Sequence, residues 1–423
     1  MLPAGFAYAG SLLFALSTYL NPVWGYYGFT FEAPGVNELA AGSLLIALVS
    51  LTMPVSIAGA ANIILFPLYV VVFVPTIVFT LTVVIGGAAK YGPALGALAA
   101  VFLLACLLTR DRVPATERKF WLPAEYLLLA VCAALATYLV AKYRSVMAFT
   151  DITSTSVYEQ RALGAATGAI DGYAQTYFAY VFCPAVLAIG LVRHRVLWIG
   201  AGLAGFVAAY MISANRTVIL LPLAMIVLFA QLTIRWRIFR SSALTVCLLA
   251  GIVAWAAAHH EDEGLSHHLA VYLVFRTVGL PGLMFSQYYD LFTAEGFTWW
   301  AHVKGMSLIV PQPLLAEHAA WPSLGYIMGD LVYKNIEVNH NAHLFASDGL
   351  AAAGALGVTV IGVVFSAWLW VLTHLSQRWD PVLTTLLLLP LGIVLTNGQF
   401  STGLLSFGGL FWLLLLWGIP QGK

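Results

Sequence analysis

Charged residues are scarce in this chain. Of its 423 residues only 9% are Asp, Glu, Lys or Arg, while 61% are hydrophobic. A typical globular chain carries about 25% charged residues, so this composition excludes a soluble domain and predicts a protein whose solvent is the lipid bilayer. The formal net charge is +1 and the basic residues are scattered, which argues against a nucleic-acid partner.

Cysteine is also rare, and the cysteines all fall inside apolar runs: Cys106, Cys132, Cys183 and Cys247. This placement excludes a disulfide framework and a cysteine zinc site, and it favours small buried apolar residues. Histidines and carboxylates gather in residues 259–268, where Glu263 and His267 have helical i, i+4 spacing. No zinc spacing is recognisable there, and a polar exit is expected after an apolar helix. We therefore expect no bound metal and no cofactor.

Long apolar runs are abundant instead. A helix that crosses the hydrocarbon core needs about 20 mostly apolar residues. About twelve runs qualify as candidates: 3–20, 39–57, 61–85, 92–109, 122–143, 173–192, 196–214, 217–233, 241–258, 350–372, 381–397 and 402–419. No cleavable signal peptide is evident. The sequence thus predicts an all-α polytopic membrane protein with about twelve transmembrane helices, forming one membrane domain over residues 1–423.

The distribution of Lys and Arg predicts the orientation. If the N-terminus is cytoplasmic, the short cytoplasmic connectors hold most of the basic residues: Arg110, Arg112, Arg118, Lys119, Arg193, Arg195, Arg235, Arg237, Arg240, Arg378 and Lys423. Such an excess on one side marks the cytoplasmic face. We expect both termini in the cytoplasm, with segments 21–38, 144–172 and 259–349 on the outer face.

Residues 259–349 form the longest polar interval, between the ninth and tenth expected helices. Connections of this length are usually functional or disordered. The apolar stretch 269–285 and the aromatic pair Trp299-Trp300 argue against disorder. The sequence predicts an ordered, partly helical cap of amphipathic helices on the outer membrane surface, covering the active site.

The end of this interval, residues 339–349, is rich in imidazole, carboxamide and carboxylate groups. Ionisable groups are costly near lipid and are functional by default there, although Asn and Asp also favour helix starts. If the stretch is helical, His340, His343 and Ser347 share one face. We expect His343 to be a general base, with Asp348 as the alternative.

Carboxamides suit the hydroxyl groups of a sugar. We therefore expect Asn339, Asn341 and His340 to bind a sugar.

Three arginines lie in separate segments of the expected outer face. Arg216 occupies a tight turn between two apolar runs, Arg276 lies in an apolar stretch, and Arg161 follows Tyr158 in the 144–172 loop. A guanidinium group in apolar surroundings requires an anion or water. Together the three arginines predict a binding site for a doubly charged anion, and a diphosphate is the natural candidate at a membrane face.

Each arginine also has a simpler interpretation. Arg216 can snorkel to lipid phosphates, and Arg161 can pair with its neighbour Glu159. Arg276 can form a structural ion pair with Asp290 or Glu295.

Three short motifs carry a resemblance to a known family. They are Asn339-x-Asn341-x-x-Leu344-Phe345-x-x-Asp348-Gly349 before a Gly- and Ala-rich run, Val157-Tyr158-Glu159-x-Arg161, and Asn215-Arg216-Thr217. In these motifs and in its hydropathy the chain resembles the O-antigen polymerase (oligosaccharide repeat-unit polymerase) family. It departs from those members that have a glycine eleven residues after an outer-loop arginine, because Val227 and Gln287 occupy these positions.

The resemblance implies a fold of the C-type glycosyltransferase kind, related to the O-antigen ligases. It implies a metal-independent enzyme that polymerises undecaprenyl-diphosphate-linked repeat units at the periplasmic face, for lipopolysaccharide or a related polysaccharide. Arg216, Arg276 and Arg161 would bind the diphosphate, and the acceptor would contact Asn339, Asn341, His340 and Tyr158. Lipid-linked donor and acceptor, membrane lipids and a chain-length regulator are the implied partners.

Two other functions stay open. An O-antigen ligase would transfer the glycan to lipid A core. A polysaccharide or lipid transporter would require ionisable residues in the middle of its helices, where this chain has almost none.

Overall fold

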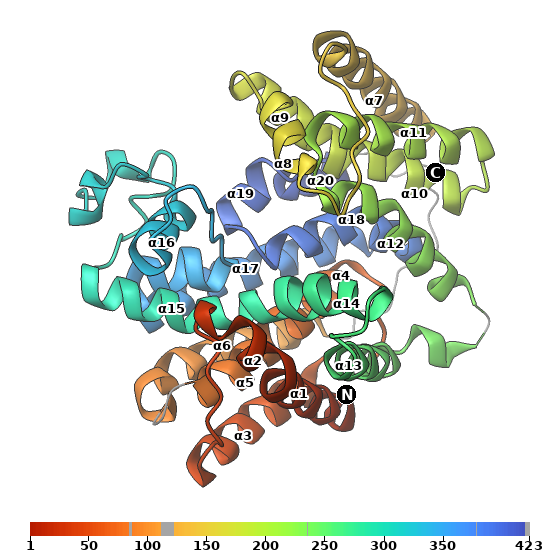
Figure 1. The fold of residues 1–423 in the computed structure, drawn as a ribbon. Helices are drawn as coiled ribbons and strands as arrows, with labels where there is room; N and C mark the ends of the chain where they lie inside the picture. Colours follow the sequence, from red (N-terminus) through yellow and green to blue (C-terminus); the bar gives the residue numbers. More distant parts are fainter. Residues whose placement is uncertain (84–86, 111–121, 235, 378, 419–423) are drawn as a thin grey trace.

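The computed structural model describes residues 1–83, 87–110, 122–234, 236–377 and 379–418, and this part of the chain is helical nearly throughout, without a β-strand (Figure 1). Some of the basic residues that predict the orientation lie outside the described residues: Arg112, Arg118, Lys119, Arg235, Arg378 and Lys423.

The elements in chain order, with η for 3-10 or π-helical turns, are α1 (Leu2–Ala15), η1 (Leu16–Leu20), α2 (Asn21–Trp24), η2 (Gly25–Tyr27), α3 (Val36–Thr52), α4 (Ala60–Pro67), η3 (Leu68–Phe73), α5 (Val74–Val83), α6 (Gly87–Thr109), α7 (Leu122–Tyr143), α8 (Ser156–Leu163), α9 (Ala169–Tyr177), η4 (Phe178–Phe182), α10 (Cys183–Val192), α11 (Val196–Ser213), α12 (Arg216–Thr233), η5 (Arg237–Arg240), α13 (Ser242–Ala258), α14 (Leu265–Leu269), η6 (Ala270–Gly279), α15 (Leu280–Glu295), η7 (Met306–Leu308), η8 (Leu314–Glu317), α16 (Leu324–Tyr333), η9 (Phe345–Leu350), α17 (Ala351–Ser376), α18 (Pro381–Leu395), α19 (Phe400–Leu405) and α20 (Gly409–Gly418).

Eight helices in the described part of the chain are long and apolar enough to cross a membrane: Ala60–Val83, Gly87–Thr109, Pro123–Tyr143, Ala169–Val192, Val196–Ser213, Arg216–Thr233, Leu265–Glu295 and Phe345–Ser376. The chain is therefore a polytopic helical membrane protein. Seven of the eight coincide with expected spans. Four further apolar helices are shorter: Val36–Thr52, Ser242–Ala258, Pro381–Leu395 and Gly409–Gly418. The expected count of twelve stays a prediction.

The eighth long helix, Leu265–Glu295, lies within the segment expected to be a surface cap. It is a single 31-residue helix that is largely covered by its neighbours, and its position on the outer membrane surface stays a prediction. The carbonyl of His260 contacts the His267 ring near one end, and Asp290 pairs with Lys90 near the other. Both partners belong to helix ends expected on the outer face, so the helix begins and ends near the same face.

The helices form two groups with a central layer between them. Figure 1 shows α1 to α3, α5 and α6 on one side and α7 to α12 on the other, with α4, α17 and α18 between them and α14 to α15 across the front. Close pairs are α6 with α17, α4 with α18, and α5 with α15. A side chain at Gly282 would collide with Pro75, and one at Gly362 with Val101. Small residues allow such close approach of membrane helices.

Several of the long helices contain a π-helical stretch, and two of these stretches carry expected site residues. Arg276 lies in η6 and Asp348 in η9. A π-helical turn inserts an extra residue and redirects the side chains around it, and it occurs often at functional sites. Just beyond η9 the helix is kinked at Ala353 and Gly354, and Gly354 has a φ of 59°. The kink releases carbonyls from the helix for other hydrogen bonds.

Polar segments expected on the outer face contact one another, through Tyr19 and His260, Lys90 and Asp290, Ile152 and Arg216, and Asp348 and Phe400. Segments expected on the inner face also meet, through Ser56 and Ser241 and through Glu125 and Arg193. The expected grouping of loops is thus internally consistent in the fold, while the sidedness in a membrane stays a prediction.

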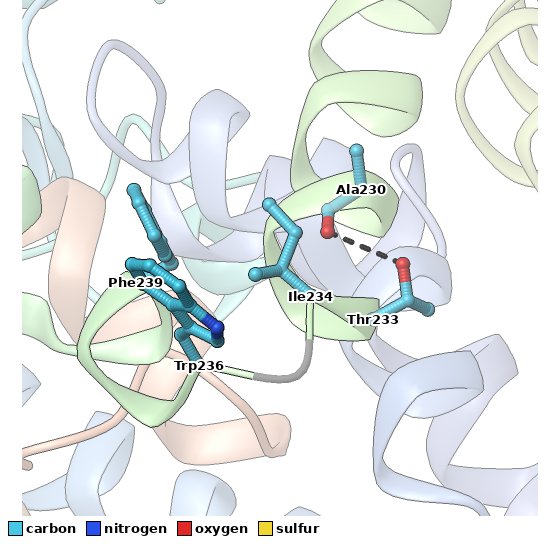
Figure 2. Close-up of a pocket in the computed structure, with 5 residues that line it drawn as sticks. All are labelled: Ala230, Thr233, Ile234, Trp236 and Phe239. Carbon is cyan, nitrogen blue, oxygen red and sulfur yellow. Dashed lines mark hydrogen bonds between the residues drawn. The ribbon is translucent and has the colours of Figure 1, made fainter.

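An open depression of about 550 Å³ lies near the expected inner face, between the end of α12 and η5 (Figure 2). Its lining is apolar except for Thr233, whose hydroxyl donates to the carbonyl of Ala230 at 3.2 Å. With no convergent polar groups, this depression is not the candidate functional site.

Glu125 joins α7 to the α10–α11 hairpin. Its side chain is fully buried and accepts from Nε and Nη2 of Arg193 at 3.1 and 2.8 Å, with Arg195 at 3.5 Å. We expect Glu125→Gln to destabilise the protein by about 2 to 3 kcal/mol, because it removes the buried carboxylate that binds the partly buried guanidinium groups of Arg193 and Arg195.

Thermal unfolding in detergent would measure this effect. Asp290→Asn is the matched control: it breaks an exposed ion pair with Lys90, and such pairs contribute at most about 1 kcal/mol. Equal shifts in melting temperature for the two variants would contradict the prediction.

Candidate functional site

Three arginines from separate elements surround the ring of Tyr158. Cζ of Arg161 in α8 is 5.7 Å from the ring centroid, and Cζ of Arg216 at the start of α12 is 6.0 Å from it. The guanidinium group of Arg276 in η6 is close enough to the Tyr158 hydroxyl to lower its pKa. Arg216 also lies 5.2 Å from the ring of Tyr272. Segments far apart in sequence thus bring three positive charges to one phenol ring.

The turn between α11 and α12 fixes Arg216. Ala214 has a left-handed φ of 45°, which reverses the chain at once, and Asn215 caps α12 by accepting from the backbone N–H of Thr217 at 3.0 Å. Arg216 then becomes the first residue of the helix, and its Nε donates to the carbonyl of Ile152 at 2.7 Å. This position lies at the positive end of the helix dipole, where an anion is favoured.

Helix α8 is anchored against the same turn. Arg161 donates to the carbonyl of Ala214 at 3.2 Å. The buried amide of Gln160 donates to the carbonyls of Val146 and Met211, each at 2.8 Å. These bonds hold the 144–172 segment over the end of α11 and so set the position of Tyr158.

None of the three guanidinium groups has a carboxylate within 4.0 Å among the described residues. Asp290, the expected structural partner of Arg276, instead binds Lys90 at 2.7 Å and Tyr91 at 2.9 Å. Arg161 and Arg276 are exposed, and Arg216 is partly exposed. The cluster therefore presents positive charge to its surroundings without an internal counter-ion.

The pKa of Tyr158 reflects this electrostatic environment. The guanidinium groups of Arg276, first, and of Arg216 hold the pKa of Tyr158 below its usual value, against the opposing effect of partial burial. A group that stabilises the phenolate also stabilises other oxygen anions. Arg276 and Arg216 are therefore suited to bind phosphate oxygens, and Arg161 adds a third positive charge beside the same ring.

His343 lies in a different environment. It is fully buried, its ring is stacked 6.1 Å from Phe285, and neither ring nitrogen has a hydrogen-bond partner of good geometry within the described part of the chain. Its nearest polar group is the backbone of Pro281. Burial lowers the pKa of His343 to about 3, so its ring is neutral near pH 7.

The prediction that His340, His343 and Ser347 share one helical face is wrong. Residues 338–343 are not helical, and the helix begins only after His343. The hydroxyl of Ser347 bonds to the carbonyl of His343 at 3.1 Å. The backbone N–H of His340 instead bonds to the carbonyl of Gly325 in α16 at 3.0 Å, which holds this segment against α16.

Asn339, Asn341 and His340 lie together. Asn339 and Asn341 are exposed, and their side-chain oxygens lie against Gly325, where a larger residue would collide with them. The ring of His340 is stacked on Tyr333, with centroids 4.0 Å apart and planes at 16°. The fourth expected acceptor residue, Tyr158, belongs to the arginine cluster instead.

Asp348 is buried and is held by two other segments. One carboxylate oxygen accepts from the backbone N–H of Phe400, and the other lies 3.6 Å from Nε2 of His302. Nδ1 of His302 is 2.8 Å from the hydroxyl of Thr298, which is 3.1 Å from the carbonyl of Ala351. This carbonyl is one of those released by the kink in α17.

A proton is required between His302 and Asp348. If the Thr298 hydroxyl donates to the Ala351 carbonyl, its oxygen accepts from Nδ1, which then carries a hydrogen. In that case Nε2 of His302 has a lone pair that faces the lone pairs of the Asp348 carboxylate, and a proton is needed between them. If the hydroxyl donates to Nδ1, the ring hydrogen is on Nε2. Neither atom has another partner among the described residues. The distance of 3.6 Å exceeds a normal hydrogen bond, so a small movement is needed to close it.

Sequence reasoning missed His302. It lies far from Asp348 along the chain and belongs to no motif, and the only signal is a single histidine beside the pair Trp299-Trp300. The long-range contact depends on two backbone bonds, from Thr298 to Ala351 at 2.8 Å and from Trp299 to Ala352 at 3.0 Å.

The arginine cluster and Asp348 are connected through α19 and the turn after it. Phe400 binds Asp348 through its backbone, and the ring of Phe407 packs 4.9 Å from Tyr180. The Tyr180 hydroxyl accepts from Asn215, the residue before Arg216, at 3.1 Å. One short segment therefore touches both clusters.

Comparison of the chain with protein-family models, with curated proteins and with solved structures found no match. Among the described residues, no group of three or more His, Cys, Asp or Glu side chains is arranged to hold a metal ion.

We expect His343 to make stability depend on pH. Its pKa is about 3 when folded and about 6.5 when unfolded, so the unfolded chain binds the proton first and stability falls as the pH drops below 6.5. Between pH 6.5 and about pH 5 this loss is about 2 kcal/mol, and His343→Leu should abolish it.

Thermal unfolding at about pH 7.5 and about pH 5 would measure the loss in wild type and variant. His259→Leu, at an exposed histidine, is the control and should keep the wild-type acid sensitivity. The same acid sensitivity in wild type and His343→Leu would contradict the prediction.

Proposed function

We propose that this chain is a membrane glycosyltransferase that polymerises undecaprenyl-diphosphate-linked oligosaccharide repeat units at the periplasmic face of a bacterial inner membrane. The observation that carries the proposal is the cluster of Arg161, Arg216 and Arg276 around Tyr158, without a carboxylate partner among the described residues. The sequence resemblance to O-antigen polymerases, which rests partly on the same residues, also supports it.

The arginine cluster matches the needs of a diphosphate leaving group. Negative charge develops on the diphosphate as the glycosidic bond breaks, and positioned guanidinium groups stabilise that charge more than they stabilise the ground state. Arg276 and Arg161 are exposed for bidentate contact. Arg216 adds the helix dipole of α12, and the apolar helices around it suit a polyprenyl tail.

The reaction is a displacement at a sugar carbon. The acceptor hydroxyl forms a new bond to the anomeric carbon of the donor sugar, and the bond from that carbon to the diphosphate oxygen breaks. The hydroxyl proton passes to a protein base, and the bond electrons leave with the lipid diphosphate, which the arginines hold. Asn339 and Asn341, both exposed, are placed to bind hydroxyl groups of the acceptor.

Asp348 with His302 is the base that the geometry supports better than His343. A base needs a path for the proton, and His302 gives Asp348 such a partner at 3.6 Å. His343 is stacked on Phe285, and neither of its ring nitrogens has a hydrogen-bond partner of good geometry among the described residues. Asp348 is closed off by the segment that carries His302, so the proposal requires this segment to move when the acceptor enters.

The arginine assignment predicts a graded loss of transfer. Arg276→Ala should lower kcat/KM about 100-fold or more. Arg276→Lys should lower it about tenfold, because the charge stays but the guanidinium fork is lost. Lipid-linked repeat units isolated from a strain that lacks this gene would serve as substrate, with polymer length read from gels.

Arg144→Ala is the matched control, since Arg144 is an exposed arginine of the same 144–172 segment but has no contact with Tyr158. Polymerisation at the wild-type rate in Arg276→Ala would overturn the assignment. Transfer to lipid A core without polymer formation would identify a ligase instead. Export of glycan without bond formation would identify a transporter.

The base assignment predicts opposite results at two positions. Asp348→Asn and His302→Gln should each lower kcat about 100-fold or more, while His343→Leu should stay within about threefold of wild type. Because Asp348 also binds the N-terminus of α19, melting temperatures and Asp348→Glu would separate lost folding from lost catalysis. If His343→Leu is inactive while Asp348→Asn is active, His343 is the base and the assignment of Asp348 is wrong.

A further inference from the structure

We propose that Trp24, Tyr26, Tyr27, Tyr333 and His340 form a stacking surface for a pyranose ring of the lipid-linked oligosaccharide. This inference rests on the proposed function and adds a sugar subsite to it. We call these residues the aromatic platform.

Tyr27 lies at the centre of the aromatic platform. Its ring centroid is 4.8 Å from Tyr26, 5.3 Å from Tyr333, 5.9 Å from Trp24 and 6.0 Å from His340. The rings come from the end of the first helical segment, from α16 and from the 339–343 loop. Such contact distances are typical of interacting aromatic rings, so three segments form one continuous surface.

Hydrogen bonds and a stacked pair hold the platform in place. The amide of Gln287 donates to the carbonyl of Tyr27 at 3.0 Å and accepts from the hydroxyl of Tyr333 at 2.6 Å. Trp24 is stacked on Phe275, with centroids 3.8 Å apart and planes at 6°. Rings fixed in this way lose little conformational freedom when a ligand binds.

The platform has the chemistry of a carbohydrate site. A pyranose has a face of C–H groups, which packs on an aromatic ring, and a rim of hydroxyl groups, which needs hydrogen-bond partners. Tyr26 is 75% exposed, which leaves its ring accessible, and the exposed carboxamides of Asn339 and Asn341 flank His340. Apolar faces beside a few polar groups are typical of small-molecule sites.

The position of the aromatic platform indicates which ligand it binds. Phe275, stacked on Trp24, directly precedes Arg276 of the arginine cluster, while His340 lies between the two asparagines. The platform therefore packs on the segment that carries Arg276, and it includes the residue between the two asparagines.

The competing explanation is an interfacial belt, in which Trp and Tyr anchor a helix end at the membrane surface. A belt residue contributes to insertion and protein level. A sugar subsite contributes to substrate affinity, and the two contributions can be measured separately.

The test uses the full-length protein and lipid-linked single repeat units from a strain lacking this gene. Tyr26→Ala should raise KM about tenfold with kcat within about twofold, because one aromatic contact is lost. Tyr26→Phe and Tyr26→Trp should restore KM, since both keep a ring. Tyr26→Gln is a second variant without a ring in case Tyr26→Ala folds poorly.

Trp236→Ala is the matched control. Trp236 is 71% exposed and follows α12, whose 18 residues separate it from Arg216 by about 27 Å. This variant should leave KM unchanged.

Each outcome decides one question. An unchanged KM in both Tyr26→Ala and Tyr26→Gln overturns the platform, and so does a lower protein level with an unchanged KM. If deletion of the gene leaves the organism's glycan polymers intact, the proposed function itself fails. If deletion of the gene abolishes the polymer but KM is unchanged in the Tyr26 variants, only the proposal of a sugar subsite fails.

Discussion

Positive charge without an internal counter-ion is the constraint on which this structure depends. Arg161, Arg216 and Arg276 meet at Tyr158, and none has a carboxylate partner among the described residues. Like charges held together in partly apolar surroundings repel one another. The cluster persists because several elements hold it: the capped turn before α12, the buried Gln160 and the long helix that carries Arg276. An anionic ligand would relieve the repulsion.

The fold uses backbone irregularity to place polar groups among apolar helices. Arg276 and Asp348 lie in π-helical stretches, and the kink at Ala353 and Gly354 releases carbonyls that bind the His302 segment. In a membrane protein every freed backbone group needs a partner inside the protein. The irregular turns therefore connect the site to the scaffold, and they fix both in one arrangement.

The three candidate surfaces are adjacent through named contacts. The turn after α19 touches the arginine cluster through Tyr180, and the start of α19 binds Asp348. Phe275 connects the arginine cluster to the aromatic platform, and His340 connects the platform to the asparagines. A lipid-linked sugar that spans these surfaces would have its charge, ring and hydroxyl groups bound by different elements. This division of roles gives each proposed residue its own measurable effect.

The sequence by itself determined the membrane character and the location of most helices, because hydropathy along a helix is a local property. Seven of the eight long apolar helices coincide with expected spans. It also singled out the arginines and the 339–349 stretch, because polar groups are conspicuous in an apolar chain. It assigned Leu265–Glu295 to surface helices, which stays a prediction. It also gave His343 and His340 a shared helical face, which differs from the structure because the helix begins only after His343. Only the tertiary structure decided which residues meet. His302 reaches Asp348, and Trp24 reaches Phe275, across long stretches of chain. Such contacts depend on the packing of whole helices, which no local pattern records.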